Sequence, residues 1–451
     1  MTQKLERSLG LADVTGIVMG AIIGVGIFFT PSDVMARTGS ASVAMAAWVV
    51  GSLIAMTGSL TFAELGALFP RTGGQYLILR ETYGRPVAFL YGWSLLTVIQ
   101  TGAIAIIGLI CIDYLARFAG LEVATATKRT GACLLIAGLT LVNARGVRHG
   151  ARVAVFTSAL KMVILLSIVL VALLFDAEPS ALSEAAARAP RGDSRWALIL
   201  PGLIPVLFSF GGWQQATFLG GEVKEPGRNL PLGIIGGVAI VGLLYVGVNL
   251  AYVTLLDPDR MASTKTVAAD AIGAVFPSVG PRIIALSVAA SALGVASVCI
   301  MTAPRMYKAI ADDGAFFSFA RRIHPRYGTP AASILVQGAI SILMVIAVGA
   351  DGIGFLLTGV VCIDWVFFFL TGLSLFILRR RLPDAERPYR AFGYPVLPGI
   401  FVLASVAVIV GAFMDSETMQ ASRVAVGVVA SGLLAYGGFR WRAGSRDSTG
   451  S

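Results

Sequence analysis

Charged side chains are scarce in this sequence: Asp, Glu, Lys and Arg make up only 13% of its 451 residues. Soluble domains carry about 25%, because a water-facing surface needs charge for solubility. The shortage excludes a string of soluble domains, which the length alone would suggest. It also excludes a disordered chain, since disorder combines low hydrophobicity with high net charge.

Histidine and cysteine are scarce too. The two histidines, His149 and His324, lie in predicted loops. The four cysteines all lie within apolar stretches: Cys111, Cys133, Cys299 and Cys362. None has the spacing of a metal site, and a free cysteine in an apolar stretch behaves as a small hydrophobic side chain. We therefore expect no disulfide scaffold, no metal site and no cofactor.

Apolar residues, by contrast, make up 56% of the chain, and the mean hydropathy is +0.82. About 20 apolar residues cross a bilayer as a helix, and lipid leaves the backbone of an open segment no other structure. The first apolar run is too long for a signal peptide and lacks a cleavage site. We therefore predict an all-α polytopic membrane protein with about twelve spans. They run approximately over residues 12–35, 42–69, 85–116, 130–144, 152–175, 198–221, 231–256, 281–310, 331–349, 353–378, 394–413 and 423–439.

The distribution of Lys and Arg sets the orientation. With the N-terminus in the cytoplasm, the cytoplasmic loops hold about twice as many of these residues as the outer face, as the positive-inside rule requires. We therefore expect both termini in the cytoplasm and the protein in the cell (inner) membrane. The same bias accounts for the formal charge of +10, so no nucleic-acid partner is expected.

Two predicted spans contain helix-breaking residues. In the first span Gly24 and Gly26 lie near mid-membrane, and a glycine inside a helix costs about 1 kcal/mol. Close helix packing through Gly16, Gly20 and Gly24 would account for part of this pattern, but not for Gly26.

The sixth span contains a matching interruption, formed by Pro205 and the pair Gly211 and Gly212. Proline removes a backbone hydrogen bond, and glycine permits non-helical dihedral angles. The two interruptions lie five spans apart, and because five is odd, the two halves enter the membrane from opposite sides. Interrupted segments at matching positions of two inverted halves indicate a transporter binding site.

A break of this kind exposes backbone groups of both signs. Half-helix N-termini offer free N–H groups and a partial positive charge, and half-helix C-termini offer free carbonyl groups and a partial negative charge. One gap can therefore bind the carboxylate and the ammonium of a zwitterionic amino acid. No acidic or basic residue lies within 22–28 or 205–215, which favours recognition by the backbone.

Several stretches, in order along spans one to ten, resemble the amino acid–polyamine–organocation (APC) transporters. They are residues 23–28, 62–76, 79–84, 143–147 and 220–231. Residues 208–213 look most like the L-type amino acid transporter branch of this superfamily.

This resemblance implies a LeuT-type fold of two inverted five-helix repeats plus two peripheral helices, which works by alternating access. The repeats would be residues 12–175 and 198–378, and the peripheral helices 394–439. Residues 1–11 and 440–451 would be the cytoplasmic ends.

The resemblance also implies a substrate site. The substrate carboxylate would meet N–H groups around Gly24, Val25 and Gly26, its ammonium would meet carbonyl groups of Ile22, Phe208 and Gly211, and Phe208 would be an aromatic gate. The full predicted set is Ile22, Ile23, Gly24, Val25, Gly26, Phe208, Ser209, Phe210 and Gly211. Many relatives carry Ser or Thr where this chain has Val25, so backbone donors must contribute more of the recognition here.

Two ionisable residues lie inside predicted spans. Lys161, in the fifth span, costs at least about 2.5 kcal/mol if it stays in lipid; it either snorkels toward the cytoplasm or has a function. The resemblance implies that it is a cation-site surrogate or a proton-coupling group, because sodium-independent relatives have a lysine where sodium-coupled ones bind a cation. Asp364, in the tenth span, is either a proton-linked group or a structural group bonded to a neighbouring helix.

A third charged group lies at a predicted cytoplasmic end, where Glu222 is followed by Lys224 and Arg228. These residues form either an inner-gate cluster or an ordinary charged loop.

We therefore expect a sodium-independent secondary transporter of amino acids, favoured as an exchanger of neutral amino acids, with proton-coupled symport as the alternative. A membrane-embedded enzyme would need a nucleophile with a base, or a metal cluster, and a channel would need a polar stripe along its pore. Neither pattern is visible, so we expect no enzyme. The expected partners are an amino acid and the lipid bilayer, with a proton as a further candidate and an accessory subunit left open.

Overall fold

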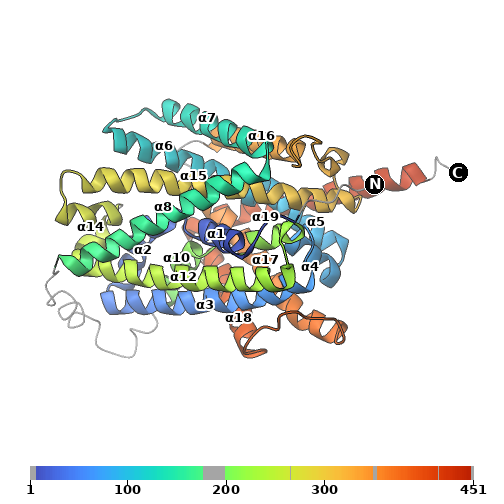
Figure 1. Ribbon diagram of the computed structural model, residues 1–451, viewed down its shortest axis with the longest axis horizontal. Helices are drawn as coiled ribbons and strands as arrows, with labels where there is room; N and C mark the ends of the chain where they lie inside the picture. The colour runs from blue at the N-terminus through green and yellow to red at the C-terminus, as the bar shows by residue number, and fades with distance from the viewer. Residues whose placement is uncertain (1–6, 176–198, 265, 349–352, 415, 448–451) are drawn as a thin grey trace.

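The computed structural model describes residues 7–175, 199–264, 266–348, 353–414 and 416–447. Within these ranges the chain is helical, and a lone backbone bridge joins Leu9 to Val223. Most of the long helices run side by side along the long axis of the molecule (Figure 1). Three parts of the sequence predictions fall outside the described residues. They are the first six residues of the predicted N-terminal segment, the last four of the predicted C-terminal segment, and the predicted connection between the two halves at residues 176–198.

The described helices include seven that are long and apolar enough to cross a membrane. They are Ala41–Leu68, Arg85–Ala119, Pro226–Leu255, Gly280–Asp312, Gly354–Arg381, Val396–Met414 and Met419–Phe439. Four shorter apolar helices accompany them: Leu11–Ile22, Ala159–Leu174, Ile199–Ser209 and Ala331–Ala347. The protein is therefore a multi-pass membrane protein that is helical throughout the part of the chain that the structure describes.

Both predicted interruptions divide a span into short helices. The first span is divided into α1 (Leu11–Ile22), η1 (Gly26–Phe28) and α2 (Thr30–Thr38). The sixth is divided into α10 (Ile199–Ser209), α11 (Gln215–Phe218) and η4 (Gly220–Glu222).

The other predicted spans correspond to longer helices. They are α3 (Ala41–Leu68), α5 (Arg85–Ser94) with η2 (Leu95–Ile99) and α6 (Gln100–Ala119), α7 (Thr125–Ala144), α8 (Val147–Leu174), α12 (Pro226–Leu255), α15 (Gly280–Asp312), α16 (Ala331–Val348), α17 (Ile353–Arg381), α18 (Val396–Met414) and α19 (Ser416–Asp447). Four short helices in connections were not predicted from the sequence: α4 (Gly74–Tyr83), α13 (Pro258–Ser263), α14 (Val267–Val275) and η5 (Ser318–Arg321).

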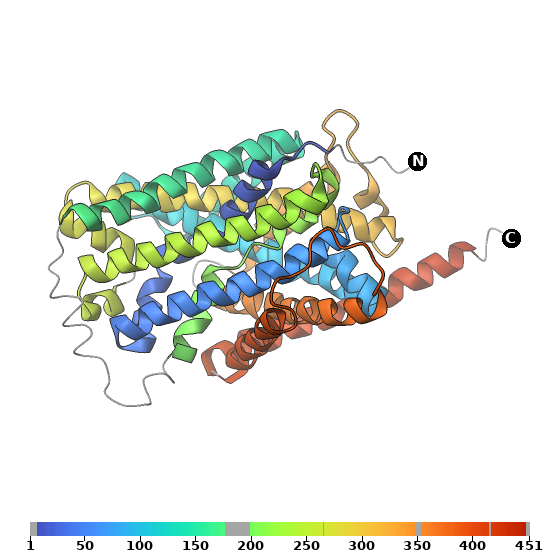
Figure 2. The same cartoon turned by 60° about the horizontal axis from the view of Figure 1, so that its bottom comes forward.

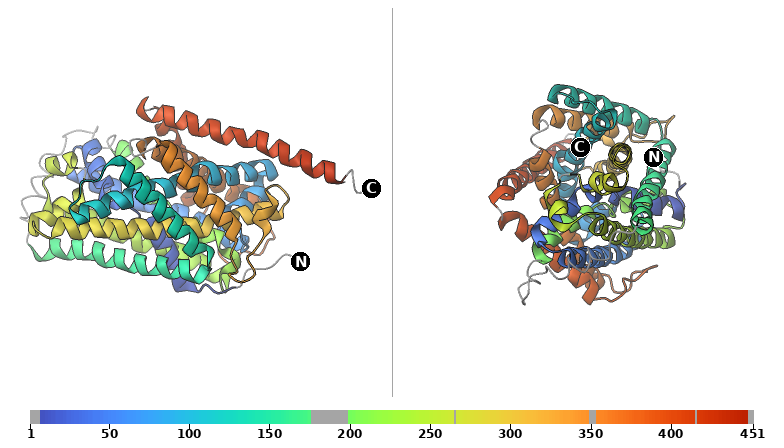
Figure 3. Two further views of the ribbon diagram at one scale, coloured as in Figure 1. Left: turned by 90° about the horizontal axis from the view of Figure 1, so that it is seen from above. Right: turned by 90° about the vertical axis from the view of Figure 1, so that its left-hand side faces the viewer.

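The broken helices lie inside the bundle. Helix α1 packs between α8, α12 and α15, and α10 packs against α3 and α2. Helices α7 and α16 cover one side, whereas α18 and α19 lie against α17 at the periphery (Figures 2 and 3). Large apolar side chains on outer faces are exposed, such as Leu243 at 78% and Leu434 at 82%, as expected for surfaces that contact lipid.

Candidate functional site

The first break begins where α1 stops following the α-helical hydrogen-bond pattern. The N–H of Ile23 still donates to the carbonyl of Met19 at 2.8 Å, but the N–H of Gly24 turns back to the carbonyl of Ile22 at 2.6 Å. The carbonyl of Gly20, which the N–H of Gly24 would satisfy in a continuous helix, is left for another donor. The chain resumes as a 3₁₀ turn at Gly26.

The second break follows α10 directly. Its last turn ends with the N–H of Gly211 donating to the carbonyl of Phe208 at 3.2 Å. Gly212 then takes a φ of +129°, in the region that favours glycine, and its N–H donates to Oε1 of Gln214 at 3.0 Å. Helix α11 starts at the next residue, Gln215.

Glycines bring the two breaks into contact. A Cβ atom on Gly212 would lie 2.7 Å from the carbonyl of Ala21, at the end of α1. A Cβ atom on Gly26 would lie 3.0 Å from Oγ of Ser209, at the end of α10. Gly212 therefore needs to be glycine, because a Cβ atom there would meet backbone atoms, whereas a Cβ atom on Gly26 would crowd the hydroxyl of Ser209.

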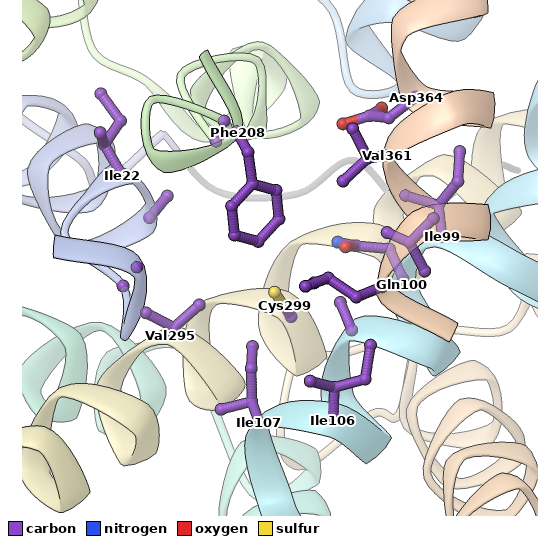
Figure 4. A pocket seen from close by; sticks show the side chains of 18 of the residues that line it. Ile22, Ile99, Gln100, Ile106, Ile107, Phe208, Val295, Cys299, Val361 and Asp364 are labelled. Atoms are coloured by element: carbon purple, nitrogen blue, oxygen red, sulfur yellow. The ribbon is translucent and has the colours of Figure 1, made fainter. Parts of the chain in front are cut away.

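The two breaks form one wall of a cavity of about 300 Å³ (Figure 4). Seven of the nine predicted substrate-binding residues line it: Ile22, Gly24, Val25, Gly26, Phe208, Ser209 and Gly211. The other two are buried outside it. The carbonyl of Ile23 faces α8 and α15, and the ring of Phe210 packs against Trp48 and Tyr245.

The rest of the cavity lining was not identified from the sequence. It includes apolar residues of α6 and α15, namely Ile106, Ile107, Ile110 and Val295, and the amides of Gln100, Gln214 and Gln215. The three glutamines are polar residues in apolar spans, and this was the signal that could have revealed them. Oε1 of Gln215 accepts hydrogen bonds from Nε2 of Gln100 at 3.3 Å and from the hydroxyl of Thr302.

Lys161 lies on α8 with its side chain 1% exposed. Its Nζ donates to the carbonyl of Ile23 at 2.7 Å and to that of Gly20 at 3.2 Å. The ammonium thus points at the first break and not toward the end of α8. A Cβ atom on Gly294 of α15 would lie 3.2 Å from Nζ of Lys161, so a glycine there lets α15 approach the ammonium closely.

Two hydroxyl groups donate to other carbonyls of this break. Oγ of Ser291 on α15 donates to Ile23 at 3.2 Å and to Gly24 at 3.1 Å. The hydroxyl of Tyr245 on α12 donates to the carbonyl of Ile22 at 3.1 Å. Because the N–H of Gly24 also donates to Ile22, both lone pairs of that carbonyl are in use. Ile22 is therefore a poorer acceptor for a substrate ammonium than the sequence suggested.

Asp364 lies on α17 and lines the cavity. Its Oδ2 accepts a hydrogen bond from Nε2 of Gln214 at 3.2 Å, while its buried Oδ1 has no partner among the described residues. Gln214 also accepts from the N–H of Gly212, so one amide connects Asp364 to the second break. The bond to Gln214, the residue directly before α11, fits the structural alternative, and the unpaired oxygen leaves the functional one open.

The prediction that Glu222, Lys224 and Arg228 pair with one another is wrong, because Glu222 and Arg228 have other partners. Glu222 pairs with Arg305 of α15 at 2.9 Å, with both side chains at most 3% exposed. Arg228 instead lies 4.0 Å from Glu225 in an exposed pair. The pairing crosses from η4 to α15, and residues so distant in sequence cannot be matched from sequence spacing alone.

The sequence was compared with known proteins. The family described as amino acid permease matches residues 9–433. The b(0,+)-type amino acid transporter 1 of Mus musculus is 30% identical over 438 residues, which cover 96% of this chain and 88% of that protein. The serine/threonine exchanger SteT of Bacillus subtilis (strain 168) is 26% identical over 450 residues, which cover 98% of each chain.

A third relative is the large neutral amino acids transporter small subunit 2 of Mus musculus. It is 30% identical over 414 residues, which cover 88% of this chain and 75% of that protein. The match to the family extends from before α1 into α19 and so includes both helix breaks. These findings confirm the resemblance noted in the sequence: this chain belongs to the amino acid permease family of APC transporters.

Proposed function

We propose that this protein is a sodium-independent amino acid transporter that works by alternating access and exchanges one neutral amino acid for another. One observation carries the proposal: two helix breaks adjoin at a cavity, and a lysine ammonium binds the carbonyl groups of the first break. The names of the relatives, among them an exchanger and a transporter of large neutral amino acids, support it.

The proposed architecture is the LeuT-type arrangement of two inverted repeats, residues 12–175 and 198–378, with peripheral helices in 394–439. Each proposed repeat begins with a broken helix, α1 with α2 and α10 with α11. The first described residues and the end of α19 lie toward the same end of the bundle (Figure 2). This arrangement supports two cytoplasmic termini in a protein of the cell membrane.

The substrate carboxylate binds at the first break. The N–H groups of Val25 and Gly26 belong to residues that line the cavity and donate to no other described residue. Val25 directly precedes the 3₁₀ turn η1 and Gly26 begins it, and the first N–H groups of a helical turn have no acceptor inside the turn. Because the N–H of Gly24 is bonded to the carbonyl of Ile22, the N–H groups of Val25 and Gly26 are the two proposed donors to the substrate carboxylate.

Lys161 makes a bound sodium ion unnecessary. Its ammonium lies among α1, α8 and α15, in hydrogen-bond contact with two backbone carbonyls. Carbonyl oxygens there would coordinate a cation in the same way. The ammonium of Lys161 already fills this place, and a second cation beside it would be repelled.

Phe208 is the proposed gate. It lines both the central cavity and a second cavity of about 220 Å³ toward Asp33 and Arg37 of α2. The route from the central cavity to the opposite side of the membrane is closed by two contacts. One is the buried ion pair of Glu222 and Arg305, and the other is the backbone contact between residues 8–9 and Glu222. In the proposed orientation, Phe208 is the outer gate and the ion pair belongs to the inner one.

Counterflow in proteoliposomes tests the proposal. Vesicles loaded with unlabelled leucine should take up labelled leucine faster than empty vesicles, and at equal rates in sodium, potassium or choline. A channel would show no stimulation by internal leucine. Accumulation in empty vesicles that is driven by an imposed pH gradient would favour the proton-coupled symporter. Sodium-dependent uptake would overturn the assignment of Lys161.

A further inference from the structure

The central cavity contains one carboxylate that nothing in the described structure neutralises. Asp364 is the sole Asp, Glu, Lys, Arg or His among the described residues that line it. Its Oδ2 receives one neutral amide hydrogen bond, and its Oδ1 is buried without a donor. A charge in a buried apolar environment is very unfavourable unless it is paired. This carboxylate therefore needs a proton or a cation from outside the protein.

The position of Asp364 fits the far end of a bound amino acid. In Figure 4 Asp364 projects from α17 on the side of the pocket opposite Ile22, with Phe208 between them. The N–H groups proposed to bind the substrate carboxylate lie near Ile22, at Val25 and Gly26. A side chain that starts at the first break and crosses the cavity would end near Asp364.

The wall between these two ends suits an aliphatic stem. Ile106 and Ile107 of α6 and Val295 of α15 form much of it (Figure 4). Methylene groups gain free energy by leaving water for such a surface, while a terminal ammonium or guanidinium needs a charged acceptor. The wall and the carboxylate together match a chain of methylene groups that ends in a cation.

We propose that Asp364 is a specificity-determining residue that binds the cationic end of a dibasic amino acid, such as ornithine or lysine, so that this chain exchanges dibasic as well as neutral amino acids. The inference rests on the proposed exchange function and adds a second substrate class to it. Gln214 holds the carboxylate in place through Oδ2 and leaves Oδ1 for the ligand. A hydrogen bond between two charged groups is about twice as strong as a neutral one.

A matched pair of ligands tests this assignment. Ornithine and norleucine have side chains of the same length, and ornithine ends in an ammonium where norleucine ends in a methyl group. Purified protein in proteoliposomes loaded with leucine is assayed for uptake of each labelled amino acid and for mutual competition. The parent protein should exchange both. In Asp364→Asn, the affinity for ornithine relative to norleucine should fall about tenfold or more, which corresponds to about 1.4 kcal/mol.

The control is Asp384→Asn, which makes the same change at an exposed carboxylate in the loop after α17. Its ratio of ornithine to norleucine affinity should equal that of the parent. An equal loss of both ligands in Asp364→Asn would overturn the proposal, because the carboxylate would then serve the α-ammonium or the fold. A parent that exchanges norleucine but ignores ornithine would also overturn it, and would favour a proton at Asp364. Failure to exchange norleucine would instead refute the proposed function itself.

Discussion

Removal of the Lys161 ammonium is the perturbation that the structure defines most sharply. In Lys161→Met the stem volume is nearly kept, but the carbonyl of Gly20 loses its donor. The carbonyl of Ile23 keeps the hydroxyl of Ser291. One buried carbonyl left unpaired costs about 1–3 kcal/mol. Relaxation of the first break to satisfy this carbonyl would distort the substrate site, and the same free energy then lowers substrate affinity by roughly 5-fold to 150-fold.

The assay is equilibrium binding of labelled leucine to the purified protein, together with the melting temperature. Ser291→Ala should cost less, because Lys161 still satisfies the carbonyl of Ile23, and the carbonyl of Gly24, which loses its donor, borders the cavity, where water can replace the hydroxyl. Ser167→Ala, on an exposed position of the same helix, should change neither quantity. If Lys161→Met binds leucine as tightly as the parent while its melting temperature drops, then Lys161 stabilises the bundle without organising the site. That result would contradict the proposed role of Lys161 in holding the first helix break in its binding conformation.

Three further predictions concern the breaks and the gates. Gly212→Ala should abolish leucine binding, because the residue has a positive φ and its Cβ atom would lie 2.7 Å from the backbone of α1. Gly24→Ala should still bind leucine, since a Cβ atom there has no neighbour closer than 3.8 Å. Equal leucine affinity of the two variants would contradict the proposed contact between the breaks. Phe208→Ala should join the two cavities that its ring borders and speed leucine efflux without external substrate, and unchanged efflux would make it a packing residue. Arg305→Met should lower the melting temperature, because an unpaired buried carboxylate at Glu222 costs about 3–5 kcal/mol. Adding Glu222→Gln should restore much of the lost thermal stability. A double variant that melts as low as Arg305→Met would contradict the proposed ion pair.

The helix breaks could be predicted because their causes are local. Two glycines near mid-span, or a proline followed by a glycine pair, weaken a helix wherever the segment lies. Lys161 could be singled out for a similar reason, since a cation in an apolar span is costly in any arrangement. What the sequence did not reveal was the number of partners around each backbone group. The carbonyl of Ile22 is already bonded to Tyr245, which is distant in the chain.

The cavity wall could not be assembled from one sequence. Ile107, Val295 and Asp364 come from α6, α15 and α17, and no spacing rule connects these helices. The partner of Glu222 was missed for the same reason, because Arg305 is 83 positions away. Short helices such as α14 were missed because nine residues are too few to cross a bilayer and to stand out as a span.

In the proposed site, backbone groups at the two helix breaks hold both charged ends of an amino acid. Competition against labelled leucine binding tests it most directly, with leucine, leucinamide, which lacks the carboxylate, and 4-methylpentanoate, which lacks the ammonium. Hydrogen bonds to charged groups contribute about 1.5–3 kcal/mol each, so the account predicts that each analogue competes about tenfold or more weakly than leucine. Leucinamide or 4-methylpentanoate competing as well as leucine would contradict it.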